Sequence, residues 1–199
     1  MEPFRYPESP LVRRHGPRGH ATYESYRPWL RDEFSFRCAY CLAREQWGRL
    51  RGTYDLDHYV AIAGDPSGEL KYDNLLYACR ACNAVKSHRQ VPDPCLVLID
   101  GDVVVQPNGR MIGRSIGAKR LIRLIGLNSP EAVEFRRLWI EILDLAQRYD
   151  PNLVVRIIGY PDDLPDLSRL RPPGGNSRPE GIAPSHFARR ERTELSETY

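Results

Sequence analysis

The chain has 199 residues, of which 41% are hydrophobic and 28% charged, and this composition indicates a soluble globular protein with one modest core. Its 29 basic and 26 acidic side chains leave a net charge of +3, which is too small to indicate a nucleic-acid partner by charge alone. The apolar runs are far shorter than the roughly 18 residues that a membrane-spanning helix needs. We therefore expect no membrane partner and, because no apolar export signal follows the N-terminal residues, a cytoplasmic location.

Four segments are expected along the chain. Residues 1–21 hold four prolines and predict an irregular arm. Residues 22–90 open with apolar side chains at helical spacing over 23–34, with Pro28 in the first turn of that helix. Residues 91–158 are expected to form a supporting hairpin and two helices, and the proline-rich residues 159–199 a disordered tail.

The supporting segment shows clear strand and helix signals. Residues 96–99 and 103–106 are β-branched runs that predict a hairpin with Asp100-Gly101 as its turn. A short helix is expected over 118–125, and Ser129-Pro130 marks the start of a longer helix that ends near Tyr149. In the longer helix, apolar residues recur at three- and four-residue steps, and we expect them to close over the core: Val133, Phe135, Leu138, Trp139, Ile142, Leu143, Leu145 and Ala146.

Four of the five cysteines occur as two C-x2-C pairs, which are Cys38/Cys41 and Cys79/Cys82. Two such pairs in one short chain predict a structural Zn2+ site, because four thiolates at about 2.3 Å satisfy tetrahedral zinc. A thiol redox role for the first pair remains a minor alternative. The fifth, Cys95, is expected to be a small buried or partly buried thiol.

Between and after the two pairs lie residues suited to phosphodiester chemistry. Hydrolysis needs a base to deprotonate water and a Lewis acid to stabilise charge on the phosphate. His58 is a natural base at neutral pH. Asp57 offers a hard oxygen ligand for Mg2+ or Mn2+, and the amide oxygen of Asn83 could complete that site.

The same stretch resembles the HNH endonucleases, the zinc-stapled ββα-metal nucleases. The resemblance covers residues 38–86 and rests on the order of four features: the two C-x2-C pairs, Asp57-His58, Asp73-Asn74-Leu75 and the Cys82-Asn83-x-x-Lys86 ending. It implies an α+β fold, in which a ββα-metal core with a four-cysteine zinc site is flanked by an N-terminal helix and by a C-terminal hairpin and two helices. It also implies cleavage of DNA that leaves a 5′-phosphate.

The resemblance assigns a role to each motif residue. It makes His58 the general base, Asp57 and Asn83 the ligands of the divalent ion, and Asn74 the residue that braces the loop. Lys86, which lies one helical turn after Asn83, is expected to contact phosphate. The chain departs from the family pattern in two places: no proline follows Asp57-His58 within a few residues, and the approach to Asn74 lacks a glycine-rich stretch.

Basic residues supply a candidate nucleic-acid surface. Residues 109–126 contain five of them and no acid, namely Arg110, Arg114, Lys119, Arg120 and Arg123. Three arginines near the start of the chain form a second group. DNA is the expected partner, and RNA stays open. The competing hypothesis is a zinc module without catalysis, which binds nucleic acid or protein through these basic residues.

Overall fold

The computed structural model describes residues 3–4, 11–49, 51–98, 102–175, 178 and 180–195. Within these residues the chain folds as α+β, with two small antiparallel sheets. One sheet pairs β1 (Asp55–His58) with β2 (Leu75–Ala78), and the other pairs β3 (Val103–Val105) with β4 (Met111–Gly113). The helices in the described residues are α1 (Arg27–Glu33), α2 (Arg80–Lys86), α3 (Pro94–Val97), α4 (Ile116–Ile125), α5 (Pro130–Tyr149), α6 (Pro151–Ile158) and α7 (His186–Glu191).

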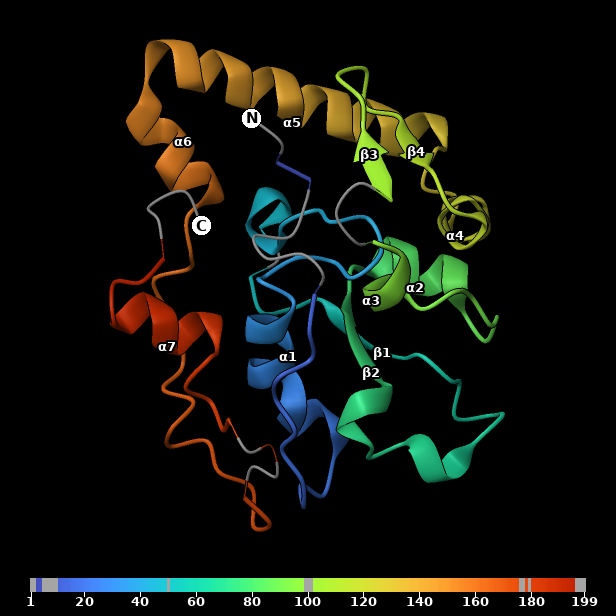
Figure 1. Ribbon diagram of the computed structural model, residues 1–199, viewed down its shortest axis with the longest axis vertical. Helices are drawn as coiled ribbons and strands as arrows, with labels where there is room; N and C mark the ends of the chain where they lie inside the picture. The colour runs from blue at the N-terminus through green and yellow to red at the C-terminus, as the bar shows by residue number, and fades with distance from the viewer. Residues whose placement is uncertain are drawn as a thin grey trace.

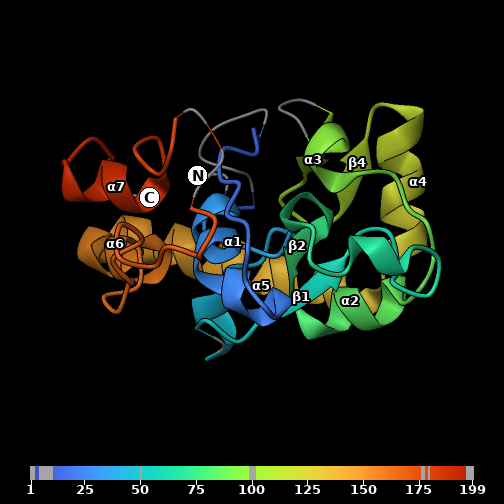
Figure 2. The same ribbon diagram turned by 90° about the horizontal axis from the view of Figure 1, so that it is seen from below.

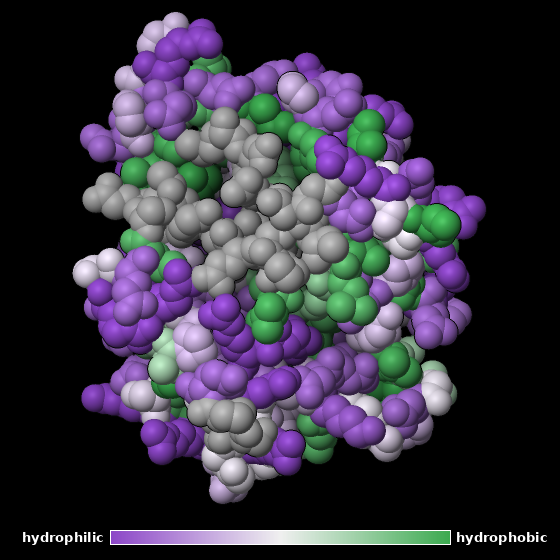
Figure 3. All heavy atoms as spheres, in the orientation of Figure 1, coloured by the Kyte–Doolittle hydropathy of each residue, from purple (hydrophilic) through white to green (hydrophobic). Residues whose placement is uncertain are grey.

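The elements are arranged around α1 and the β1–β2 sheet (Figures 1 and 2). Helices α2, α3 and α4 lie to one side of this centre, α6 and α7 lie to the other, and α5 runs along one edge. Hydrophilic side chains cover most of the face in Figure 3, with apolar side chains in small groups between them. None of the helices in the described ranges combines the length and hydropathy required to span a bilayer.

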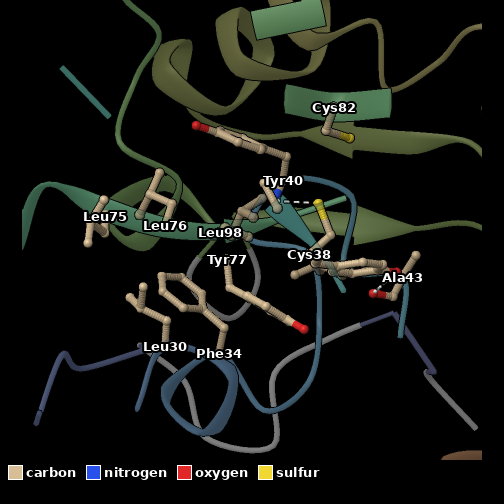
Figure 4. Packing of buried hydrophobic residues seen from close by; sticks show 14 of the residues in the cluster. Leu30, Phe34, Cys38, Tyr40, Ala43, Leu75, Leu76, Tyr77, Cys82 and Leu98 are labelled. Atoms are coloured by element: carbon tan, nitrogen blue, oxygen red, sulfur yellow. Dashed lines mark hydrogen bonds between the residues drawn. The ribbon is translucent and has the colours of Figure 1, made fainter. Parts of the chain in front are cut away.

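The centre of the core lies between α1 and β2. All four residues of β2 are buried, whereas β1 is buried only at its two middle residues. Leu30 and Phe34 point from the α1 segment toward Tyr77 of β2 (Figure 4), and all three side chains are fully buried. Because β2 leads directly into α2, this packing also fixes where α2 begins.

The predicted N-terminal helix is confirmed. A 3-10 turn at Tyr23–Tyr26 runs into α1, and Pro28 lies in the first turn of α1, where its missing N–H costs no hydrogen bond. Residues 11–20 contain no helix, but they dock on α1 because the Glu33 carboxylate accepts the backbone N–H of His15 at 2.8 Å. The same carboxylate also accepts the Tyr72 hydroxyl at 2.9 Å. The Arg13 guanidinium pairs with the same carboxylate, so this arginine is not available to a phosphate.

The predicted hairpin exists, but its strands differ from the prediction. Val103–Val105 does form a strand, yet its partner is Met111–Gly113, and the turn between them holds Gly109. Gly109 has φ +83°, and a Cβ there would lie 2.2 Å from the Val133 oxygen of α5, so only glycine fits. Residues 96–97 belong to α3 instead of a strand, and the predicted Asp100-Gly101 turn lies outside the described residues.

The two later helices are confirmed, although α4 begins at Ile116, two residues before its predicted start. Gly126 ends α4 in the left-handed conformation with φ +69°. The Ser129 hydroxyl accepts the N–H of Ala132, and Pro130 occupies the first turn of α5, which ends at Tyr149. Local capping chemistry therefore sets both helix limits.

The apolar stripe of α5 is only half used by the core, which corrects the expectation that it closes over the interior. Leu143 and Ala146 are buried, and Trp139 stacks on Trp47 with ring centroids 4.8 Å apart. Leu138 and Leu145, one helical step away, are exposed. The buried Arg136 also attaches the helix, because its guanidinium donates to the carbonyl oxygens of Gly109 and Leu127.

The C-terminal segment corrects a second expectation, that residues 159–199 are disordered. Its described part contains α7, which contacts α1, and its Leu167 and Phe187 side chains join the main core. Asp32 of α1 accepts the backbone N–H of Phe187 at 2.5 Å, and the imidazole of His186 lies 3.0 Å from the Ser35 hydroxyl. One apolar cluster thus runs through all the expected segments, and the boundaries at 90 and 158 do not separate two cores.

Candidate metal centre and functional site

The four paired cysteines converge on one point. Their Sγ atoms all lie within 4.8 Å of one another, and the Sγ atoms of Cys41 and Cys79 are 3.9 Å apart. Four sulfurs around Zn2+ at about 2.3 Å would be roughly 3.8 Å apart. The four thiols are free, with no disulfide among them. The donor set and its spacing fit a structural zinc ion, with no position left open for a substrate.

Two different local structures supply the ligands. Cys38 and Cys41 lie on a tight loop, in which the Cys38 sulfur accepts the N–H of Tyr40 at 3.4 Å (Figure 4). Cys79 caps the N-terminus of α2, and Cys82 lies in its first turn. Burial, as the largest cause, raises the pKa of the Cys38 thiol well above its usual value, so a bound cation is needed to keep four thiolates together.

Cys95 lies apart from this cluster, near the start of α3. Burial raises the pKa of its thiol to about 12. It is therefore a partly buried, protonated thiol, as its sequence position suggested.

His58 lies at the end of β1 and is held from two sides. Its Nε2 lies 2.9 Å from the carbonyl oxygen of Glu69, and its ring meets the Tyr23 ring edge-on with centroids 4.8 Å apart. A carbonyl oxygen only accepts hydrogen bonds, so Nε2 carries the proton and, in the neutral ring, Nδ1 carries the lone pair. The contact thus selects the tautomer whose free nitrogen can act as a base.

Asn74 braces the loop that contacts His58. Its side-chain oxygen accepts the Val60 N–H at 2.8 Å, and its amide nitrogen donates to the carbonyl oxygens of Val60 at 3.0 Å and Gly68 at 3.2 Å. Both ends of the loop between β1 and β2 are therefore tied to one side chain. Because Gly68 immediately precedes Glu69, this clamp also positions the carbonyl that orients His58.

Asp57 and Lys86 form a buried ion pair. Asp57 is 5% exposed and Lys86 only 1%, and the Lys86 ammonium lies 2.8 Å from Asp57 Oδ1 and 2.7 Å from the His58 carbonyl oxygen. The Tyr40 hydroxyl donates to Asp57 Oδ2 at 2.5 Å. Burial raises the pKa of Asp57, while the hydrogen bonds from Lys86 and Tyr40 oppose that shift. Lys86 therefore does not lie at the surface where it was expected to contact phosphate.

The structure does not bring Asp57 and Asn83 together as a divalent-ion site. The Asn83 amide donates to the carboxylate of Asp55 at 3.1 Å, and both carboxylate oxygens of Asp57 already have donors. An Mg2+ or Mn2+ ion needs free carboxylate oxygens, so the residues as arranged do not fit one. Asp55 and Asp57 share a face of β1 because residues two apart in a strand point the same way, and His58 points to the other face.

Asp55 and Tyr40 are the polar residues that the sequence interpretation missed. The two-residue step from Asp57 to Asp55 was a signal that could have placed Asp55 opposite α2. Tyr40 carried no such signal, because its approach to Asp57 depends on how the Cys38 loop packs on β1. Its pKa is raised by burial and by the nearby Asp57 carboxylate, which keeps the hydroxyl protonated as a donor.

The predicted basic residues lie on the surface of β4 and α4. All five are exposed, and none has an acidic partner within the part of the chain that the structure describes: Arg110, Arg114, Lys119, Arg120 and Arg123. Helix α4 contacts α2, which also carries the exposed Arg80. The basic surface therefore adjoins the helix that holds Asn83 and two of the cysteines.

Three comparisons with known proteins found nothing similar: no family model, no curated protein and no solved structure matches the chain.

Proposed function

We propose that the protein is a zinc-stapled endonuclease of the HNH type that hydrolyses phosphodiester bonds in DNA. The single observation that carries this proposal is the fixed imidazole of His58, whose Nε2 donates to the Glu69 carbonyl while Asn74 braces the loop that holds Glu69. A histidine with a purely structural role would not need both a hydrogen bond to Glu69 and a second residue that fixes the position of Glu69.

His58 is the proposed general base. Its Nδ1 accepts a proton from a water molecule as the water oxygen attacks phosphorus, the bond from phosphorus to the 3′ oxygen breaks, and that oxygen takes a proton from solvent water. The four-thiolate zinc holds α2 and the Cys38 loop together and takes no part in the reaction. Because the residues around Asp57 do not fit a divalent ion as they are arranged, no step is assigned to one.

The exposed basic surface of β4 and α4 is the proposed contact for the DNA backbone. Its five cations have no acidic partner among the residues that the structure describes, so their charge is available to phosphates. It adjoins α2, which packs beside β1 and its His58. A duplex bound along this surface would lie beside α2, the helix that packs against β1.

Replacing His58 with alanine tests the catalytic role. We expect plasmid nicking to fall by about 10²- to 10⁴-fold, the usual contribution of a positioned base. The assay is run without added divalent ion, with Mg2+ and with Mn2+, and zinc content is checked in each preparation. His88→Ala is the matched control, because His88 is exposed just after α2 and its imidazole hydrogen-bonds to the neighbouring Ser87 hydroxyl. Nicking that persists in the His58→Ala protein would exclude His58 as the base.

One observation favours a second candidate function, a binding module without catalysis. The Lys86 ammonium neutralises Asp57, which removes the carboxylate that a catalytic ion would use. If neither wild type nor His58→Ala nicks DNA under any of the three ionic conditions while both retard it in a gel, this second function replaces the first.

The basic surface has its own test. We expect the double variant Arg120→Ala/Arg123→Ala to weaken DNA binding and to lower the salt dependence of binding by about one unit of slope for each lost phosphate contact. Fluorescence anisotropy with a labelled duplex over a range of salt measures both. The control is Arg169→Ala/Arg171→Ala, two arginines between α6 and α7, which should leave affinity and slope unchanged. Equal losses of DNA affinity in the two double variants would contradict a specific role for α4 in DNA binding.

A further inference from the structure

Helix α5 carries a stripe of exposed apolar side chains that the core does not use. Leu138, Leu145 and Tyr149 are 50%, 54% and 77% exposed, and Ile142 is partly exposed between them. Figure 1 shows α5 along one edge of the molecule. Large apolar side chains repeated in this way usually mark a contact surface.

The spacing of the stripe is that of a helix–helix seam. From Leu138 the steps are four, three and four residues, which places all four side chains on one face over about 17 Å of helix. The residues that hold α5 to its own core follow a separate row through Arg136, Leu143 and Ala146. The fold thus leaves a complete three-turn seam without a helix beside it in the described residues.

The charges beside the seam select its partner. Glu141 and Arg148 border it on one side, at the positions where charged residues pair across a coiled coil. Glu141 has an exposed ion pair with Arg137 at 3.2 Å, whereas Arg148 has no acidic partner within the described residues. A partner should therefore present an acid next to Arg148 and a base next to Glu141.

We propose that the partner is a second copy of this chain, which packs its α5 antiparallel against the first. If Ile142 lies opposite Leu145 of the second copy, Leu138 lies opposite Tyr149, and every seam residue meets another seam residue. In this same alignment Glu141 and Arg148 of the second copy lie next to each other beside the seam, about two residues out of step, and the two-fold axis repeats the pair. A parallel arrangement would instead place these charges opposite Trp139 and Ala146, so only the antiparallel one pairs them.

The resulting contact is short and gives a weak, concentration-dependent dimer, as small interfaces do. It does not depend on the proposed nuclease activity, because none of its residues belongs to the site around His58. The two-fold axis would double the number of basic surfaces in one particle.

Sedimentation-velocity ultracentrifugation of the zinc-loaded full chain over a wide concentration range tests the dimer. We expect wild type to shift from monomer to dimer as concentration rises and Leu145→Glu to stay monomeric. Thermal melting and zinc content confirm that the variant is folded. A wild-type protein that remains monomeric at every concentration, or a Leu145→Glu protein that still dimerises, would overturn the proposal.

A charge swap tests the antiparallel alignment. Glu141→Arg and Arg148→Glu should each weaken dimerisation roughly tenfold, because each places like charges opposite one another twice. The double variant Glu141→Arg/Arg148→Glu should restore the wild-type dimerisation constant. Asp144→Arg, a charge reversal on the same helix outside the paired positions, is the control. A double variant no better than the single ones would refute this alignment.

Discussion

Cys82→Ser is expected to release zinc and to unfold the region around α2 and the β1–β2 sheet. Cys79 and Cys82 attach the start of α2 to the Cys38 loop, and α2 has only seven residues, too few to be stable alone. Structural zinc sites bind with an apparent free energy of about 10–16 kcal/mol. That value is as large as the whole stability of an ordinary domain, roughly 5–15 kcal/mol, so one lost thiolate should have a severe effect.

Metal analysis and circular dichroism measure this result. Wild type should contain one zinc ion per chain and lose both the ion and its cooperative melting transition on chelation. Cys95→Ser is the matched control, since Cys95 lies outside the cluster, and it should retain zinc and most of its stability. A Cys82→Ser protein that keeps stoichiometric zinc and the wild-type melting temperature would show that the four sulfurs do not hold a structural ion.

Lys86→Met is expected to destabilise the protein by about 3–5 kcal/mol, because it leaves the Asp57 carboxylate buried without its cation. The methionine preserves most of the volume of the lysine stem, so the lost charge dominates the effect. Urea denaturation in zinc-containing buffer measures the change. Lys71→Met, which removes an exposed lysine, should change stability by less than about 0.5 kcal/mol.

The double variant Lys86→Met/Asp57→Asn isolates the ion pair. It removes both charges and keeps an acceptor for the Tyr40 hydroxyl, so it should be more stable than Lys86→Met alone. If the losses in unfolding free energy of Lys86→Met and Asp57→Asn simply add in the double variant, the two side chains are not coupled. The buried ion pair would then not be what fixes α2 against β1.

Short-range signals in the sequence predicted much of the fold. Ser129-Pro130 and Gly126 act through hydrogen bonds and backbone angles within a few residues, so the ends of α4 and α5 follow from local chemistry. The two C-x2-C pairs similarly predicted the four-sulfur cluster, because the short spacing lets both sulfurs of a pair, on the Cys38 loop or at the start of α2, reach one point. The resemblance implied a loop-bracing role for Asn74, and its side chain hydrogen-bonds to Val60 and Gly68 in the loop between β1 and β2.

The parts that the sequence did not predict depend on contacts between distant residues. Lys86 pairs with Asp57, 29 residues away, and nothing local shows that its ammonium turns inward. Helix α7 has six residues and is held by Asp32 and Ser35 of the α1 segment. The proline-rich composition of this segment suggested disorder. The residues that stabilise α7 lie far earlier in the chain, so the local sequence does not reveal them.

This last arrangement has a consequence for how the protein is made. The backbone N–H of Phe187 reaches Asp32 across 155 residues, so α1 gains its full set of contacts only after Phe187 has left the ribosome. Contacts between such distant residues also slow folding. The nascent chain would expose part of α1 until the segment that contains α7 has docked on it.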